Sequence, residues 1–275
     1  MGQAGKRAES EFKEARGEVQ IPHAEIKAYI EPLIGGSLAE SLENLSAAPH
    51  FIPSLDSSKK SATDGKRLFP LQAIIPKLIL KDGHIVGGAS TEDGLLDLAA
   101  VRDFVLGIKI GGVFRTHLVE RLTQEQGLST DGILAHFRKW GHCKDKHFEF
   151  LGIGLAHYFK GDYVSAIHVL VPQFEDILRG FLERAGQPIS DPRRGKFLVL
   201  DSILTNPVLV EVAGEDLITW YRLSLSDPAG INLRNDVAHG LSSPEVMTKE
   251  TAELVIHLLL SLTRFNLDDK NAGSR

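Results

Sequence analysis

The stretch that decides the fold of its surroundings reads Leu233-Arg234-Asn235-Asp236-Val237-Ala238-His239-Gly240. Leu233 and Val237 are four positions apart, which puts both side chains on one face of a helix, where they can be buried. Gly240 is the residue type that most readily takes the left-handed conformation that ends a helix. The pattern predicts a short helix over residues 231–239 that stops at Gly240.

The polar residues of this stretch fall on another face of the same helix. Asn235 and His239 are four apart, which suits a hydrogen bond from the amide to the imidazole, and Asp236 can serve the same purpose. His239 would lie at the helix C-terminus, where the dipole favours imidazolium by roughly 0.3–1 kcal/mol. Arg234 is long enough to reach the same opening. A titratable imidazole beside a permanent cation suits phosphate-ester chemistry, because the ring exchanges a proton while the guanidinium holds phosphoryl charge.

A second interpretation of the same residues needs no reaction. An Arg-Asn pair in a short helix that ends in His-Gly also serves for capping and for hydrogen bonds between helices. The eight residues alone leave both interpretations open.

The motif resembles the signature of a family of uncharacterised domains defined by Arg-Asn-x-x-x-His-Gly, and it fits the wider HEPN pattern of an arginine followed within a few residues by a histidine. Upstream, Tyr158-Phe159-Lys160-Gly161-Asp162-Tyr163 and Pro172-Gln173-Phe174-Glu175, with Arg179, are similar to the helix that precedes the motif in that family. The resemblance covers roughly residues 150–265 and does not extend to residues 1–125.

The resemblance implies an all-α, HEPN-like helical bundle that acts as a metal-independent endoribonuclease in RNA degradation or phage defence. His239 would activate a ribose 2′-hydroxyl for attack on the adjacent phosphate, leaving a 2′,3′-cyclic phosphate. Arg234 would stabilise the charged transition state, and Asn235 would position the histidine or the phosphate. Asp236 would support His239. The substrate would be RNA, and neither a metal nor a cofactor is implied.

Two other classes of function stay open. HEPN-like bundles also serve as non-catalytic modules that bind a nucleotide, an RNA or a partner protein. The third class is a structural scaffold in which Arg234 and His239 belong to a buried polar network. An exposed His239 paired with a second copy favours the nuclease, a ligand pocket without a second histidine favours the binding module, and burial favours the scaffold.

A long helix is predicted from Asp162 to Arg184, and it carries further candidate site residues. Glu175 and Arg179 are four apart in the order that forms a surface ion pair. Alternatively, as the resemblance suggests, Glu175 orients Arg234 and Arg179 adds positive field at the site. The same two readings, structural or functional, apply to Gln173.

A final helix is predicted from Ser243-Pro244 to about Phe265, and it is apolar on nearly every side. Burial in the core and burial in a subunit interface both explain this composition. HEPN relatives commonly pair through such helices, so the resemblance implies a homodimer whose two motifs share a cleft. A second His239 would then be the general acid.

The composition restricts the kind of partner and compartment. A formal net charge of −5 over 275 residues argues against bulk electrostatic coating of nucleic acid and leaves room for a local basic patch. The single cysteine, Cys143, excludes an intrachain disulfide. His136, His142, Cys143 and His147 have the residue types of a metal site but no standard zinc spacing. We expect a cytoplasmic protein without membrane spans.

Two regions are predicted, residues 1–125 and residues 126–275. The first is mainly helical, with loop and one hairpin near residues 47–92; the hairpin spans Lys77 to Val86, turns at Asp82-Gly83 and is the only expected β structure. Helices are expected at 94–106, 113–126, 130–140 and 145–160, with a break at Gly111-Gly112. Residues 191–196 form a basic loop, either an exposed linker or a recognition surface.

Overall fold

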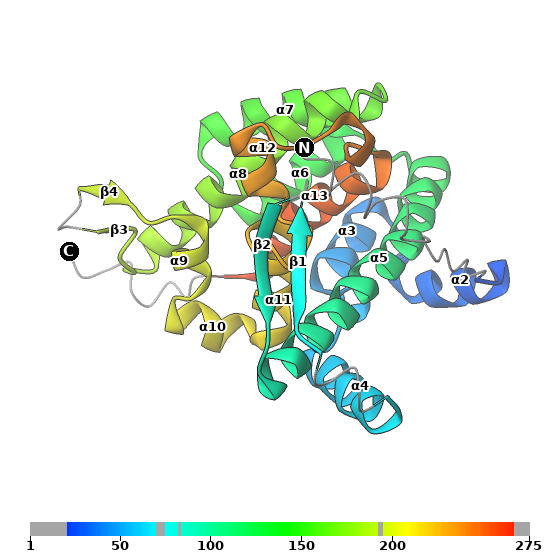
Figure 1. The fold of residues 1–275 in the computed structure, drawn as a ribbon. Coiled ribbons are helices and arrows are strands. Elements are labelled where there is room, and N and C mark those ends of the chain that lie inside the picture. The colour runs from blue at the N-terminus through cyan, green and yellow to red at the C-terminus, as the bar shows by residue number, and fades with distance from the viewer. Residues whose placement is uncertain (1–20, 70–74, 82–83, 192–194, 267–275) are drawn as a thin grey trace.

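The computed structural model describes residues 21–69, 75–81, 84–191 and 195–266 (Figure 1). Helices make up most of these ranges, and the strands within them form two small antiparallel pairs. The predicted all-α fold class with a small hairpin is therefore confirmed.

The N-terminal region consists of four helices, two short 3₁₀ turns and one hairpin in the described ranges. They are α2 (His23–Ile30), η1 (Glu31–Leu33), α3 (Leu38–Ala47), η2 (Pro49–Phe51), α4 (Leu55–Leu68), β1 (Lys77–Lys81), β2 (His84–Ala89) and α5 (Glu92–Gln126).

The C-terminal region holds the long helices α6 to α8, a two-residue strand pair and a series of shorter helices before the last one. They are α6 (Thr130–Trp140), α7 (Asp145–Phe159), α8 (Tyr163–Arg184), β3 (Ser190–Asp191), β4 (Lys196–Phe197), α9 (Leu200–Leu204), α10 (Pro207–Ala213), α11 (Glu215–Leu225), α12 (Leu233–His239), η4 (Pro244–Val246), α13 (Lys249–Ser261) and η5 (Leu262–Arg264).

Helix α4 lies where the sequence predicts loop. Ser54 caps its N-terminus, with Oγ accepting from the backbone N–H of Ser57 at 3.3 Å. The loop prediction is wrong here because α4 is polar nearly all round and shows no apolar stripe. Its packing along α5 supplies the stability that its own composition does not.

Helix α5 runs unbroken through Gly111-Gly112, so the predicted break is also wrong. Each interior glycine costs about 1 kcal/mol relative to alanine, but the buried side chains of Phe104 and Ile108 offset that cost. Glycine also allows a close approach. A Cβ atom on Gly107 would lie 2.9 Å from Cγ of Pro53.

The predicted hairpin is confirmed as β1 paired with β2, with Lys77 opposite Ala89 and Lys81 opposite His84. Its predicted turn at Asp82-Gly83 lies outside the described residues. A second pair, β3 with β4, shows that the expectation of a single hairpin is wrong. Strands of two residues are too short to carry an alternating pattern, so sequence periodicity could not reveal them.

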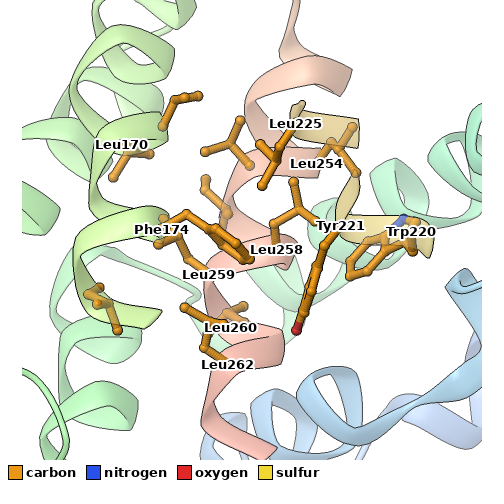
Figure 2. Close-up of a cluster of buried hydrophobic side chains, with 14 of the residues drawn as sticks. Leu170, Phe174, Trp220, Tyr221, Leu225, Leu254, Leu258, Leu259, Leu260 and Leu262 are labelled. Carbon is orange, nitrogen blue, oxygen red and sulfur yellow. The ribbon is translucent and has the colours of Figure 1, made fainter. Parts of the chain in front are cut away.

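Helix α13 is the centre of the core. Every residue from Ala252 to Ser261 is buried, and the helix packs against α3, α5 and α8. In Figure 2 its leucines face Phe174 from α8 and Tyr221 from α11. Burial in the core, at about 1.5–3 kcal/mol per large apolar side chain, therefore explains its apolar composition. This buried segment leaves no apolar face for a second subunit, so a subunit interface through α13 is not what the structure shows.

The two predicted regions share this core. The division at residue 125 falls in the last turn of α5, which ends at Gln126. Buried residues from both sides of it form one cluster, including Leu42 and Phe104 from the first region and Phe174 and Leu258 from the second. One hydrophobic core, formed by both regions, consequently supports the candidate site.

Candidate active site around Arg234

Helix α12 has the predicted position and the predicted stop. Gly240 follows His239 in the left-handed conformation, with φ of 66°. Leu233 is buried and Val237 packs against the core, as their spacing requires. The apolar face lies against α8 and α11, which brings the polar residues of the motif beside the long helix that precedes it.

Arg234 is held by a carboxylate from α8. Its Nε donates to Oε2 of Glu175 at 2.9 Å, and its Nη2 lies 2.8 Å from the same oxygen. Its Nη1 donates to Oδ1 of Asn235 at 3.2 Å. The Arg234 side chain keeps 27% of its surface exposed, whereas Glu175 keeps 11%. The guanidinium is thus fixed by Glu175 and Asn235 and remains partly open to solvent.

Glu175 also binds Arg179, through its other carboxylate oxygen. Nη2 of Arg179 donates in addition to the carbonyl of Leu198 at 3.2 Å, and the guanidinium lies over the Phe197 ring, 5.3 Å from its centroid. Both side chains of the Glu175–Arg179 pair are largely buried. The interpretation of this pair as a surface ion pair is therefore wrong, since Glu175 is a buried bridge between two arginines.

Asn235 does not contact the imidazole of His239. Its Nδ2 donates to the carbonyl of Ser226, at the end of α11, and to Oδ1 of Asn232, both at 2.9 Å. Within the described ranges no hydrogen bond joins it to His239, so that expectation is wrong. The amide instead ties α12 to α11 and supports the Arg234 guanidinium.

Asn232 is a site residue that the sequence reasoning missed. It precedes α12 in the left-handed conformation, with φ of 59°, and its Nδ2 donates to Oδ1 of the buried Asp236 at 2.9 Å. The available signal was an asparagine just before a short helix, since asparagine is one of the few residues that tolerate this conformation. Asp236 is accordingly engaged by Asn232 at the start of the helix.

His239 is the last residue of α12, and its side chain is exposed. It lies five positions after Arg234, at the end of the helix where the carbonyl groups point outward. Exposure argues against the scaffold class, which requires a buried histidine.

Gln173 is not part of this arrangement. Its Nε2 reaches the carbonyl of Val169 on its own helix at 3.4 Å. Two positions separate it from Glu175, which corresponds to about 200° around a helix. The buried Gln173 therefore faces away from the carboxylate that holds Arg234.

A second carboxylate, Asp176, extends the charged network toward α7. Its Oδ2 lies 2.5 Å from Nζ of Lys146 and 2.7 Å from Nε2 of His147. Burial acts to raise the pKa of Asp176, but the hydrogen bonds from Lys146 and His147 bring it below its usual value. Burial lowers the pKa of His147, whose Nδ1 accepts from the backbone of Lys144. His147 is therefore a neutral donor to Asp176.

The residues with metal-site chemistry around position 140 do not converge. His136 contacts Ser46 and Thr263, whereas His147 contacts Asp176, so the two rings have no partner in common. Burial raises the pKa of the Cys143 thiol to about 12, which disfavours the thiolate that binds metals. Among the described residues no group of three or more His, Cys, Asp or Glu side chains is placed to hold a metal ion.

Comparisons with family models, curated proteins and solved structures found no match to this chain. The resemblance to HEPN domains accordingly stays a prediction from the motif and the preceding helix. No helix in the described part of the chain is long and apolar enough to cross a membrane.

Proposed function

We propose that Arg234 and His239 form the active site of a metal-independent endoribonuclease. The observation that carries the proposal is their presentation: an exposed imidazole at the end of α12, and, five positions earlier on the same helix, a guanidinium that Glu175 and Asn235 fix while leaving part of it open. An oriented cation and an accessible proton acceptor on one rigid element are what transesterification of a phosphodiester needs.

The chemistry follows from these two groups. The His239 imidazole takes the proton of a ribose 2′-hydroxyl, and the 2′-oxygen attacks the adjacent phosphorus. The bond to the 5′-oxygen of the next nucleotide breaks, that oxygen takes a proton, and a 2′,3′-cyclic phosphate remains. Arg234 carries five N–H groups, of which the contacts to Glu175 and Asn235 engage three at most. The others are available to the phosphoryl oxygens in the transition state.

The charge around Arg234 is compatible with a phosphate. Three permanent cations, Arg234, Arg179 and Lys146, neighbour the two carboxylates of Glu175 and Asp176. Each carboxylate is bound by at least one of the cations, so its repulsion of a phosphate is largely compensated. The buried Asp236 of α12 adds a third carboxylate, so the formal charges of the cluster are balanced, and the attraction of an RNA phosphate depends on the open donors of Arg234.

The leaving oxygen needs a proton donor, and a second copy of His239 across a two-fold axis would supply it. Such a homodimer remains part of the proposal. Because α13 is buried within one chain, the interface would have to use another surface, one that brings the exposed ends of two α12 helices together.

Cleavage of a labelled single-stranded RNA in EDTA tests the proposal. The wild-type protein should cut the RNA and leave a 2′,3′-cyclic phosphate, a strand with 2′-deoxyribose at the cut position should resist, and His239→Ala should be inactive. His23→Ala is the matched control, because His23 is an exposed histidine on α2, outside the site. Equal cutting by wild type and His239→Ala would contradict the assignment.

One observation favours the alternative of a non-catalytic binding module. A cavity of about 450 Å³ is lined by residues of α4, α5 and β1, among them the cations Lys66, Lys77 and Arg102, the ring of Phe69 and one carboxylate, Asp103. Its size and cations suit a small phosphate-bearing ligand. Saturable nucleotide binding that Lys77→Ala and Arg102→Ala abolish, in a protein that cuts no RNA, would make the binding module the better description.

A further inference from the structure

The aromatic ring of Phe197 is exposed but held in place. Phe197 ends β4, where it pairs with Ser190 of β3, and 68% of its surface is open to solvent. The backbone on its C-terminal side is fixed twice: the N–H of Leu198 donates to the carbonyl of Ile189 at 2.9 Å, and the carbonyl of Leu198 accepts from Arg179. The ring thus projects from an anchored segment.

One face of that ring is occupied and the other is free. The guanidinium carbon of Arg179 lies over it, 5.3 Å from the centroid. Since most of the side chain is nevertheless exposed, the opposite face must be the one that meets solvent. The neighbouring residue Lys196 is exposed as well, but successive residues of a strand point to opposite faces, so its ammonium does not share the face of the ring.

This ring is connected to the candidate active site by two side chains. Arg179 binds one oxygen of Glu175, and Arg234 binds the other. A continuous chain of contacts therefore runs from the strand pair to α12, through Phe197, Arg179, Glu175 and Arg234. A molecule whose phosphate lay on Arg234 would extend naturally over this chain toward the ring.

We propose that Phe197 is a stacking platform for one base of a bound single-stranded RNA. This inference rests on the proposed function and names its substrate class. Every base has a π face, so the contact tolerates any sequence, and it requires an unpaired strand because bases within a duplex are already stacked. Arg179 positions the ring and shields its inner face.

Binding measurements test the platform independently of cleavage. Fluorescence anisotropy with a labelled single-stranded RNA, in the His239→Ala background, should show that Phe197→Ala raises Kd about 5- to 150-fold, the range found for loss of one base stack. Phe197→Trp should keep the affinity, and Phe197→Leu should lose it although it preserves apolar bulk. Val199→Ala is the control, because Val199 is an exposed apolar residue two positions along the same segment.

Two further readouts separate stacking from a structural effect. The dependence of log Kd on log salt should keep its slope in Phe197→Ala, because no phosphate contact is removed. An RNA with one abasic position at the contacting nucleotide should bind wild type and Phe197→Ala equally.

The outcomes also distinguish this inference from the proposed function. If the wild-type protein cuts RNA but Phe197→Ala and Phe197→Leu bind with wild-type affinity, the platform is overturned and the nuclease stands. If no RNA is cut but Phe197→Ala weakens binding of single strands in the predicted way, the nuclease fails while the platform stands.

Discussion

Nε of Arg234 lies 2.9 Å from Oε2 of Glu175, although 59 positions separate the two residues in the sequence. This contact joins α12 to α8, and Glu175 extends it to Arg179 through the other oxygen. One largely buried carboxylate therefore determines where two guanidinium groups lie, and its removal would affect the fold and the candidate site together.

Glu175→Gln should destabilise the protein by about 2–3 kcal/mol. The amide keeps the shape of the side chain but removes the negative charge that pairs with Arg234, while Arg179 keeps only the longer contact to Asp176 at 3.7 Å. Breaking a buried ion pair costs about 3–5 kcal/mol when burial is complete. Urea denaturation at pH 7 measures the change. Glu183→Gln is the control on the same helix, because its pair with Lys144 is exposed and 3.7 Å long; its effect should stay below about 0.5 kcal/mol. Equal effects would contradict the bridging role.

Arg234→Lys should separate binding from catalysis under the proposed function. A lysine can keep the charge near Glu175, but its single ammonium cannot also hold Asn235 and present donors to a phosphate. We expect single-turnover cleavage to slow by about 100- to 1,000-fold, as for loss of one preorganised oxyanion donor, while Kd for RNA changes little. A rate close to that of wild type would show that Arg234 acts only as a point charge or not at all.

Asn232 offers a comparison between backbone strain and hydrogen bonding. Asn232→Gly keeps access to φ of 59° but loses the side-chain contacts to Asn235 and Asp236. Asn232→Ala loses the same contacts and also has to adopt a conformation that costs a non-glycine residue about 1–2 kcal/mol. The free energy of unfolding should therefore fall by about 1 kcal/mol more for alanine than for glycine. Equal losses would mean that α12 relaxes to another conformation.

Stability should decline below pH 6.5 because of His257. Complete burial, together with Arg115 and Arg264, holds the pKa of His257 well below its ordinary value of 6.5. Between that lowered pKa and 6.5 the unfolded chain binds a proton that the folded chain does not, so unfolding becomes easier as the pH falls. The contribution approaches about 1.4 kcal/mol per pH unit.

Comparing the stability of wild type and His257→Gln at each pH isolates the contribution of His257. Urea denaturation of wild type and His257→Gln at pH 7.5, 6.5, 5.5 and 5.0 should give stability curves that converge as the pH falls, because only wild type carries this titration. His136, whose pKa is also lowered by burial, contributes equally to both proteins and cancels. Parallel curves would show that His257 does not control the acid response.

The candidate site was only partly predictable from sequence. The helix around Arg234 follows from local rules, namely the spacing of Leu233 and Val237 and the stop at Gly240. Its partner Glu175 lies in another helix, and only the resemblance suggested the pairing. The hydrogen bonds of Asn235 went unforeseen because an amide four residues from an imidazole also has carbonyls on neighbouring helices within reach.

The same division between local and tertiary causes holds for the fold. The 77–86 hairpin and the long helix α8 have clear local signals. Helix α4 has no local signal, because packing on α5 is what stabilises this polar segment. The glycines of α5 suggest a break in the sequence, and only the structure shows that α5 packs closely against η2 there. For α13 the sequence predicts that every side of the helix is buried. It does not tell whether the same chain or a second subunit buries it, because that depends on the contacts with α3, α5 and α8.

The central place of α13 has a consequence for how the protein is made. During synthesis, the inner faces of α3, α5 and α8 emerge before the helix that covers them exists. Those leucine-rich surfaces stay open to collapse with one another or with other nascent chains until α13 leaves the ribosome. An aggregation-prone interval is therefore expected between the synthesis of α8 and that of α13, and chaperones would have to cover it.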